Sequence, residues 1–265
     1  WTPAASPSAT TDHLRGWQAW AVNARDHGFE DLADHLGAAY LRYSFTKGTT
    51  QEVRFLVEAL GIEPGMRVLD VGCGPGRHAH ALGALGIEVH GIDISQRFID
   101  LAREDAPAGV TFERVDARAL TFTNEFDAAI SLCQGAFGLA DWGEDVKKID
   151  PDLDVLHGIA RALKAGGTAA VTAFSAYFQV RHVEAMGSTF YAERGVNHER
   201  TTIKDEQGSD AEADLWTSCF TPRELRLMAK DAGLTVENIW SVTPGGYRRD
   251  EPTLESEEFL LIATK

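Results

Sequence analysis

Apolar residues recur at helical spacing along the first sixty residues of the chain. The pattern predicts three helices, over residues 13–25, 29–43 and 50–60. The first of these carries Trp17 and Trp20 on its apolar face. Residues 1–12 are rich in Pro, Ser, Ala and Thr, and we expect them to form a flexible tail. The chain therefore begins with a predicted tail and an N-terminal helical cap at residues 13–58.

From residue 67 onward, short apolar runs typical of buried strands alternate with helical segments. Five runs are predicted as strands, at residues 67–71, 88–92, 110–114, 126–132 and 168–174. Helices are predicted at residues 77–85, 96–104 and 151–163. Strands that alternate with helices in this way form a parallel sheet with helices on both faces. We therefore expect a doubly wound α/β domain.

The alternation stops for about 45 residues after the fifth strand, at residues 175–219. Two β-prone runs, 198–204 and 213–220, flank a polar turn that contains Gly208, and this pattern predicts a β-hairpin. We expect this lid insert to cover the sheet, to form a dimer contact, or to do both. A homodimer is therefore one of the states that the sequence allows.

The alternation of helices and strands resumes after the lid insert, with a helix that begins at a capping box. Thr221 and Glu224 have the required spacing, and Pro222 suits the first position of a helix. This helix is predicted to run to Gly233. The last two strands are predicted at residues 234–242 and 258–264. We assign residues 60–265 to one domain that contains the lid insert.

Composition and charge narrow the classes of function. Hydrophobic residues make up 44% of the chain and charged residues 25%, as in ordinary globular proteins. A net charge of −15 disfavours binding to nucleic acid, which is itself a polyanion. The sequence has no apolar run of about 18 residues and no signal-peptide pattern, so no membrane span is predicted. The three cysteines form no CxxC pair, which fits a cytoplasmic protein.

A glycine-rich loop, Asp70-Val71-Gly72-Cys73-Gly74-Pro75-Gly76, joins the first strand of the sheet to the next helix. Dinucleotide sites have the spacing GxGxxG, but Arg77 stands where the third glycine is needed. Pro75 also lacks the N–H group that a phosphate would use. The loop therefore favours a ligand that has adenosine but no phosphates, and it disfavours an NAD-dependent oxidoreductase.

Further motifs follow in the order found in a known family. They are Asp93 at the end of the second strand, Asp116-Ala117 after the third, the run 126–130 followed by Cys133 and Gln134, and the turn 163–167 before the fifth strand. Together with residues 68–76 as the first motif, this series resembles the class I S-adenosylmethionine-dependent methyltransferases that act on small molecules. The resemblance covers residues 60–174 well and residues 220–265 moderately.

The resemblance implies S-adenosyl-L-methionine as the cofactor and a role for each matched residue. Asp93 would hold both ribose hydroxyls, because a carboxylate accepts two short hydrogen bonds from a cis-diol. Ile94 and Phe98 would flank the adenine, while Asp116 and the N–H group of Ala117 would bind its edge. The implied cofactor-binding residues are Asp70, Gly72, Cys73, Gly74, Gly76, Asp93, Ile94, Phe98, Asp116 and Ala117, with Cys133 and Gln134 near the sulfonium.

Several of these residues also have a purely structural interpretation. Gly72 and Gly74 could serve only a tight turn between strand and helix. Asp93 could be a helix cap, and Asp116 could lie in a solvated loop. Cys133 is assigned no chemistry, because a buried cysteine usually behaves as a small apolar residue.

The sequence predicts no metal site. His78 and His80 stand about 200° apart on a helix and cannot share an ion; we expect His78 at the helix surface rather than facing the cofactor. The segment Leu132-Cys133-Gln134 lacks the carboxylate that metal-dependent catechol methyltransferases place after the fourth strand. Methyl transfer needs a general base only when the acceptor must lose a proton. The sequence therefore leaves the catalytic residue unknown.

Residues that contact the methyl acceptor must come from the segments that cover the cofactor. Aromatic residues in the helical cap and the lid insert suit an apolar, flat or cationic acceptor. The candidates for acceptor binding are Trp20, Tyr40, Tyr43, Tyr177 and His182. The candidates for catalysis are His182, Tyr191 and His198. The alternative is that these side chains only pack a core.

The sequence thus predicts a Rossmann-like α/β fold, with a mostly parallel seven-stranded sheet whose last strand is antiparallel, as the resemblance implies. The predicted reaction transfers a methyl group from S-adenosyl-L-methionine to an oxygen, nitrogen or carbon atom of a small metabolite or natural product and leaves S-adenosyl-L-homocysteine. Two alternatives stay open. One is non-methylating chemistry on the same cofactor, such as cyclisation, and the other is a non-catalytic regulatory protein that binds the cofactor.

Overall fold

The computed structural model describes residues 27–139 and 150–265, so the predicted tail and the predicted helix at 13–25 lie outside the described residues. The described part of the cap contains α1 (Phe29–Leu36), the 3-10 helices η1 (Gly37–Arg42) and η2 (Ser44–Gly48), and α2 (Thr49–Leu60). The prediction of one helix over 29–43 is therefore wrong. The α-helix stops at Gly37, whose φ of 48° lies outside the right-handed helical region.

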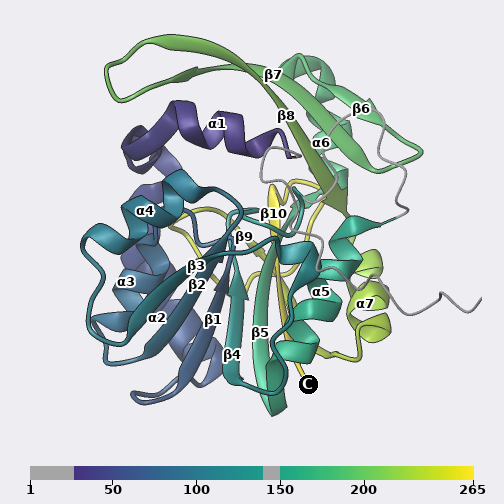
Figure 1. Cartoon of the computed structure of the whole chain (residues 1–265). Coiled ribbons are helices and arrows are strands. Elements are labelled where there is room, and N and C mark those ends of the chain that lie inside the picture. Colours follow the sequence, from purple (N-terminus) through teal and green to yellow (C-terminus); the bar gives the residue numbers. More distant parts are fainter. Residues whose placement is uncertain (1–26, 140–149) are drawn as a thin grey trace, which may run out of the picture.

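Seven strands form the central part of a ten-stranded sheet within the described residues (Figure 1), and the other three strands belong to the lid insert. The seven central strands are β1 (Arg67–Val71), β2 (Glu88–Asp93), β3 (Val110–Arg114), β4 (Phe126–Ser131), β5 (Leu163–Ser175), β9 (Thr235–Val242) and β10 (Glu258–Thr264). Their order is β3-β2-β1-β4-β5-β10-β9, and β10 is antiparallel to both of its neighbours. The predicted architecture is thereby confirmed. The carboxyl ends of β1 to β5 meet at one edge of the sheet, where α/β proteins bind their ligands.

Helices cover the two faces of this sheet, as the alternating pattern predicts. One apolar core joins α5 (Pro151–Ala162) and α7 (Pro222–Asp231) to the face that carries Leu69 and Val171. The other core joins α2, α3 (Arg77–Gly83) and α4 (Gln96–Glu104) to the face that carries Val68 and Ile130. Both faces of the strands are buried, which explains their nearly continuous apolar runs.

The lid insert contains α6 (Ala176–Met186), β6 (Thr189–Tyr191), β7 (Val196–Lys204) and β8 (Asp210–Phe220). The predicted hairpin is present as β7 and β8, which pair antiparallel from Val196 opposite Ser218 to Lys204 opposite Asp210. The last two residues of β8, Cys219 and Phe220, pair parallel with the end of β5. In Figure 1 this hairpin arches over α1. At its turn, Glu206 accepts hydrogen bonds from Arg97 Nη2 at 2.6 Å and from the Ala38 backbone N–H at 2.8 Å. The hairpin is therefore attached to α4 and to η1.

Local signals in the sequence locate most element boundaries. The capping box is confirmed: Glu224 N–H donates to Thr221 Oγ1, and Thr221 N–H donates to the Glu224 carboxylate. The boundary of β5 differs, because the strand begins at Leu163 rather than at residue 168. The predicted turn at 163–167 is an irregular start of that strand, with a register shift opposite Phe126 and Ala128.

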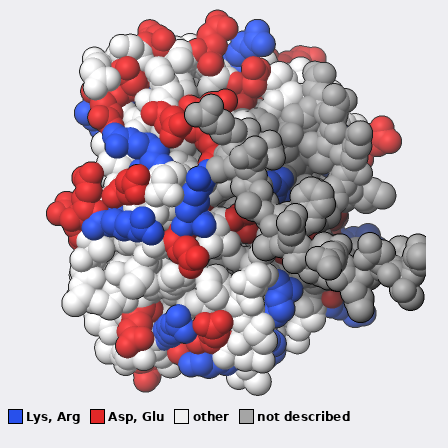
Figure 2. All heavy atoms as spheres, viewed as in Figure 1, with Lys and Arg blue, Asp and Glu red and all other residues white. Residues whose placement is uncertain are grey.

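Positive and negative side chains are interspersed on the surface. On the face in Figure 2, Lys and Arg lie among Asp and Glu rather than in one basic patch over the described atoms. Within residues 27–139 and 150–265, no helix is long and apolar enough to span a membrane.

Candidate functional site

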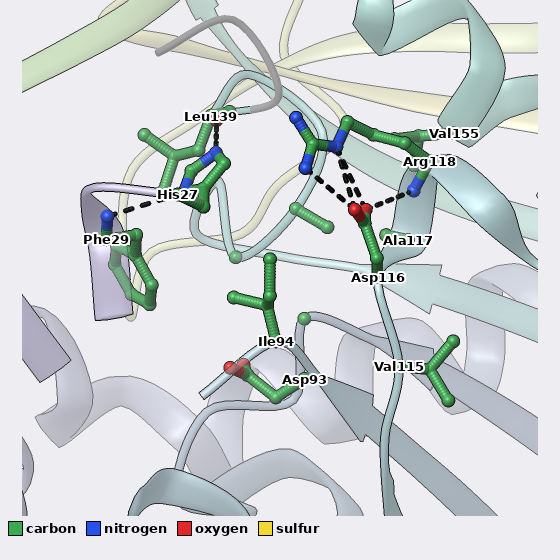
Figure 3. A pocket seen from close by; sticks show the side chains of 13 residues that line it. His27, Phe29, Asp93, Ile94, Val115, Asp116, Ala117, Arg118, Leu139 and Val155 are labelled. Atoms are coloured by element: carbon green, nitrogen blue, oxygen red, sulfur yellow. Dashed lines mark hydrogen bonds and ion pairs between the residues drawn. The ribbon is translucent and has the colours of Figure 1, made fainter. Parts of the chain in front are cut away.

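A cleft opens at the carboxyl ends of β1 to β4 (Figure 3). Five residues of the predicted cofactor set line it: Gly72, Asp93, Ile94, Asp116 and Ala117. The rest of the lining comes from His27, Phe29, Val115, Arg118, Gly135, Ala136, Leu139 and Val155. The cleft thus combines two carboxylates with largely apolar walls, as a site for a small organic ligand requires.

Gly72 and Gly135 make a backbone-to-backbone contact at the floor of the cleft. A Cβ atom on Gly72 would lie 2.2 Å from the carbonyl carbon of Gly135, and a Cβ on Gly135 would lie 2.2 Å from Gly72 O. Gly72 also has a φ of 75°. No side chain fits either position. The loop after β1 and the loop after β4 are therefore held together through their main chains.

Asp93 is a buried carboxylate that lines the cleft. Its Oδ2 accepts a hydrogen bond from Gly74 N–H at 2.9 Å, and its Oδ1 accepts one from Ser95 N–H at 2.8 Å. Burial raises the pKa of Asp93 to about 6, although these hydrogen bonds oppose the rise. The cap of α4 is Ser95, whose hydroxyl accepts from Phe98 N–H, so Asp93 is not a helix cap.

Asp116 lies across the cleft from Asp93, on the turn after β3 (Figure 3). Arg118 donates to both of its oxygens, at 3.0 Å from Nε to Oδ1 and 2.7 Å from Nη2 to Oδ2. Burial would raise the pKa of Asp116, but the Arg118 hydrogen bonds lower it overall. The ion pair holds this carboxylate in one orientation at the cleft, so Asp116 does not lie in a fully solvated loop.

His27 and Phe29 line the cleft from the side of the cap, and neither was predicted from the sequence. The His27 ring donates from Nε2 to Leu139 O at 3.0 Å, and Nδ1 accepts from Phe29 N–H. Burial lowers the pKa of His27 to about 4, so the ring is neutral at physiological pH. A neutral aromatic wall of this kind suits a flat, uncharged ring.

The remaining predicted residues of the glycine loop lie behind the cleft. Asp70 is 1% exposed, and its Oδ2 has no hydrogen-bond partner among the described residues. Burial raises the pKa of Asp70 to about 7, against the lowering effect of Arg77. Cys73 is also buried, which raises the pKa of its thiol. A Cβ on Gly76 would lie 2.9 Å from Phe112, so Gly76 permits close packing of α3.

Cys133 and Gln134 form a strained corner directly after β4. Each has a φ of 51°, which is unusual for residues other than glycine and costs on the order of 1–3 kcal/mol. Arg77 Nη2 donates to Cys133 Sγ at 2.8 Å. Burial raises the pKa of Cys133 to about 12, so its thiol stays protonated. Gln134 is 4% exposed, and its Nε2 has no hydrogen-bond partner in the described part of the chain.

A buried ion-pair cluster next to this corner was not predicted. Glu52 of α2 accepts hydrogen bonds from Arg77 Nη1 and from His78 Nε2, both at 2.7 Å. Burial alone would raise the pKa of Glu52, but His78 and Arg77 bring it down to about 2. The expectation of a surface position for His78 is therefore wrong, because α3 turns this side chain towards α2 rather than to solvent. Arg77, at the place of the third dinucleotide glycine, is the only sequence signal for this cluster.

Glu258 and Tyr247 are two further buried polar residues that the sequence analysis missed. Glu258 begins β10 and lies opposite Phe174 of β5 and Val242 of β9. It is 6% exposed, and its Oε2 has no hydrogen-bond partner among the residues described. Tyr247 is 2% exposed, and its hydroxyl is likewise unpaired within them. Because β10 is antiparallel, its first residue lies at the edge of the sheet where the parallel strands end.

The candidates in the lid insert do not meet in a common site. His182 Nε2 lies 3.4 Å from Glu255, and His198 Nε2 lies 2.8 Å from Asp214, both at the protein surface. Tyr191 packs against Trp216. Tyr177 is 41% exposed and lines a separate groove beside α6. None of these four side chains lines the cleft, so the structure does not bring them together with the predicted cofactor-binding residues. The catalytic role of His182, Tyr191 and His198 and the acceptor-binding role of Tyr177 and His182 stay predictions.

The aromatic candidates of the cap have different positions. Tyr40 packs on Phe98, with ring centroids 4.9 Å apart, and its ring lies 3.8 Å from the Cβ that Gly74 would carry. Phe98 is fully buried behind the cleft rather than in its lining. The Tyr43 hydroxyl accepts a hydrogen bond from Lys204 N–H at the hairpin. Trp20 lies outside the described residues.

Among residues 27–139 and 150–265, no three His, Cys, Asp or Glu side chains form a group that could hold a metal ion. Independence from metal ions stays a prediction.

Comparisons with known proteins agree with this geometry. Residues 68–167 match the family model described as a methyltransferase domain. The chain is 30% identical to the cypemycin N-terminal methyltransferase of a Streptomyces species, over 75% of this chain and 82% of that protein. It is 26% identical to the ubiquinone biosynthesis O-methyltransferase of Thiobacillus denitrificans, over 68% of each chain.

A solved structure with a similar fold is the CcbJ methyltransferase from Streptomyces caelestis. It superimposes with a TM-score of 0.65 at 21% identity, over 81% of this chain and 88% of that one. An S-adenosylmethionine-dependent methyltransferase from Clostridium acetobutylicum superimposes with a TM-score of 0.60 at 14% identity, over 89% of this chain and 97% of that one. Because these sequence identities are low, at 21% and 14%, the two structures show a common fold and nothing more.

Proposed function

Because this chain belongs to the class I S-adenosylmethionine-dependent methyltransferases, we propose that it methylates a small metabolite, a natural product or the end of a short peptide. Its relatives differ in this respect, since one is named for a peptide N-terminus and another for ubiquinone biosynthesis. The acceptor would bind where the carboxyl ends of β4 and β5 meet the start of β10.

The cleft residues fit the adenosine part of S-adenosylmethionine. Asp93 would hold the ribose diol, and Ile94, Val155 and the neutral His27 ring would enclose the adenine. Asp116 carries an ion pair with Arg118 and still has lone pairs free for an amino group. The buried carboxylate of Asp93 and the half-buried carboxylate of Asp116 would repel a diphosphate, which favours this cofactor over a dinucleotide.

The cofactor supplies a methyl group that its sulfonium already activates. The protein must therefore align the acceptor and exclude water. Gly72 and Gly135 form a rigid floor, and the strained backbone of Cys133 and Gln134 fixes the corner beside it. The thiol of Cys133 accepts a hydrogen bond from Arg77 and stays protonated, so it is not a competing methyl acceptor.

The proposed acceptor site is supported by a group of unpaired polar atoms beyond the adenosine cleft. Gln134 Nε2, Tyr247 Oη and Glu258 Oε2 are buried and have no partner within the described residues. Leaving such atoms unpaired costs about 1–3 kcal/mol each, and a polar ligand can remove that cost. A purely cofactor-binding regulatory protein has no need for them.

Mass spectrometry of reaction mixtures tests the proposed function. Wild-type protein incubated with S-adenosylmethionine and a panel of amines, phenols and acidic carbon compounds should yield an acceptor that is heavier by one methyl group, together with S-adenosylhomocysteine. Asp93→Asn provides a control with an impaired cofactor site. Transfer of a different group, or cyclisation, would instead favour the non-methylating alternative. Tight binding of NADH in calorimetry, with no binding of S-adenosylhomocysteine, would contradict the cofactor assignment.

A further inference from the structure

Glu258 is a carboxylate that the fold buries without a full set of partners. It occupies the first position of β10, between Phe174 and Val242, and is 6% exposed. Its Oε2 atom has no hydrogen-bond partner within the described residues. An unpaired carboxylate is one of the most costly groups to bury. A position that packing alone determined would carry an apolar residue, as the next five positions of β10 do, from Phe259 to Ala263.

The charges around Glu258 do not neutralise it. Arg77 lowers its pKa, but this guanidinium already donates to Glu52 and to Cys133. Glu52 and the exposed neighbour Glu257 both raise its pKa. Burial has the largest effect and raises the pKa of Glu258 to about 7.

Two neutral polar side chains complete the surroundings of Glu258. The Gln134 side chain lies against Glu258 and lowers the pKa of that carboxyl through a side-chain hydrogen bond. Neither Gln134 Nε2 nor Glu258 Oε2 has a partner of good hydrogen-bond geometry among the residues described. The Tyr247 hydroxyl is unpaired in the same way, and Glu258 helps to raise its pKa. Gln134 of the loop after β4 and Tyr247 of the loop before β10 thus both interact with Glu258, at the start of β10, beside the strained corner.

We infer, on the basis of the proposed methyl transfer, that Glu258 binds the nitrogen of an amine acceptor and removes the proton that blocks its lone pair. A cation is the ligand that compensates a buried carboxylate, and an ammonium group also donates the hydrogen bonds that Oε2 lacks. The net charge of −15 further favours a cationic acceptor over an anionic one.

The ammonium form of the acceptor gives one proton to the Glu258 carboxylate and becomes a neutral amine. The nitrogen lone pair then forms the new bond to the methyl carbon, while the carbon–sulfur bond breaks and its electron pair stays on sulfur. The products are a methylated ammonium ion and neutral S-adenosylhomocysteine, and Glu258 returns its proton to water. A carboxylate with a pKa near neutrality is suited to this exchange.

Turnover with matched probes tests the inference. The amine probes are benzylamine, tryptamine and trialanine, and the controls without a free amine are benzyl alcohol, tryptophol and N-acetyl-trialanine. We expect wild-type enzyme with S-adenosylmethionine to methylate at least one amine and none of its matched controls. Glu258→Gln should lower kcat/KM for that amine about 100-fold or more and abolish its rise through neutral pH. Glu258→Asp should restore part of the rate.

Glu257→Gln is the matched control, because it removes the same charge from the exposed neighbouring position. Its kcat/KM should stay within about twofold of wild type. The dissociation constant for S-adenosylhomocysteine should be unchanged in Glu258→Gln. A loss of S-adenosylhomocysteine affinity equal to the loss of turnover would overturn the inference, since Glu258 would then bind the cofactor.

Three further results would overturn the inference about Glu258 without contradicting the proposed function. They are methylation of oxygen or carbon probes only, turnover of an amine that Glu258→Gln leaves unchanged, and failure of wild-type enzyme to methylate any of the three amines. If wild-type enzyme methylates catechol in the same assay, each of these three results still agrees with the proposed methyltransferase function. If no probe of any class gains a methyl group, the proposed function fails as well.

Discussion

The burial of Glu258 should make the stability of the protein depend on pH, and Glu258→Gln isolates its contribution. The pKa of Glu258 is about 7 in the folded chain, against an ordinary value of 4.5 in the unfolded chain. Between these two values the folded state binds more protons than the unfolded state. Stability therefore falls as pH rises from 4.5 through 7, and the loss is complete above the folded pKa.

The difference between the folded and unfolded pKa values of Glu258 determines how much stability is lost. Linkage gives a destabilisation by Glu258 of about 3 kcal/mol near pH 8.5 and about 1 kcal/mol near pH 5.5. Gln has the same shape but no charge, so Glu258→Gln should raise the free energy of unfolding by about 2 kcal/mol more at the higher pH than at the lower. Any cost of the amide itself cancels in this difference. Asp70 and Asp93 titrate in the same range, but they are present in both proteins and cancel too.

Urea denaturation of the ligand-free protein at the two pH values provides the measurement, with tryptophan fluorescence as the signal. Glu257→Gln is the control, and its effect should differ by less than about 0.5 kcal/mol between the two conditions. An equal effect of Glu258→Gln at both pH values would refute the reasoning, because Glu258 would then be solvated or paired in the native state.

Three further predictions concern the cofactor and the cover of the site. Asp93→Asn should weaken binding of S-adenosylhomocysteine by about 2–3 kcal/mol, or roughly 30–150-fold, in calorimetry; an unchanged affinity would assign Asp93 only to holding Gly74 and Ser95. EDTA should leave turnover unaffected, and activity that returns only on adding Mg²⁺ or Zn²⁺ would contradict this. S-adenosylhomocysteine should slow hydrogen exchange in the lid insert at 175–219 as well as in the glycine loop, and protection of the loop alone would show that the insert is not part of the closed site.

Short-range patterns in the sequence were sufficient to predict most of the fold. The strands β1, β3 and β10 have the predicted bounds, because their apolar runs are flanked by residues that end strands. Thr221 and Glu224 marked the start of α7 for the same reason, since a capping box involves only neighbouring residues. The motifs that carried the resemblance also depend on local spacing, and five of their residues line the cleft.

The parts that could not be predicted depend on contacts between distant segments. Glu258 is buried because β10 inserts between β5 and β9, and only that pairing brings its carboxylate to the carboxyl edge of the sheet. His78 is buried because α3 packs against α2. Conversely, His182 and His198 belong to an aromatic-rich insert that the sequence suggested as a cover for the cofactor, but their rings lie beside Glu255 and Asp214 at the protein surface.

The backbone contact between Gly72 and Gly135 has a consequence for the order in which the two substrates bind. Gly72 belongs to the loop that faces the cofactor, and Gly135 directly follows Gln134, which faces the proposed acceptor. A bound cofactor that restricts the first loop must also restrict the second, so each ligand should raise the affinity for the other by the same factor. Because this coupling is reciprocal, we expect no compulsory order: either substrate can bind first, and the dissociation constant of each falls when the other is bound.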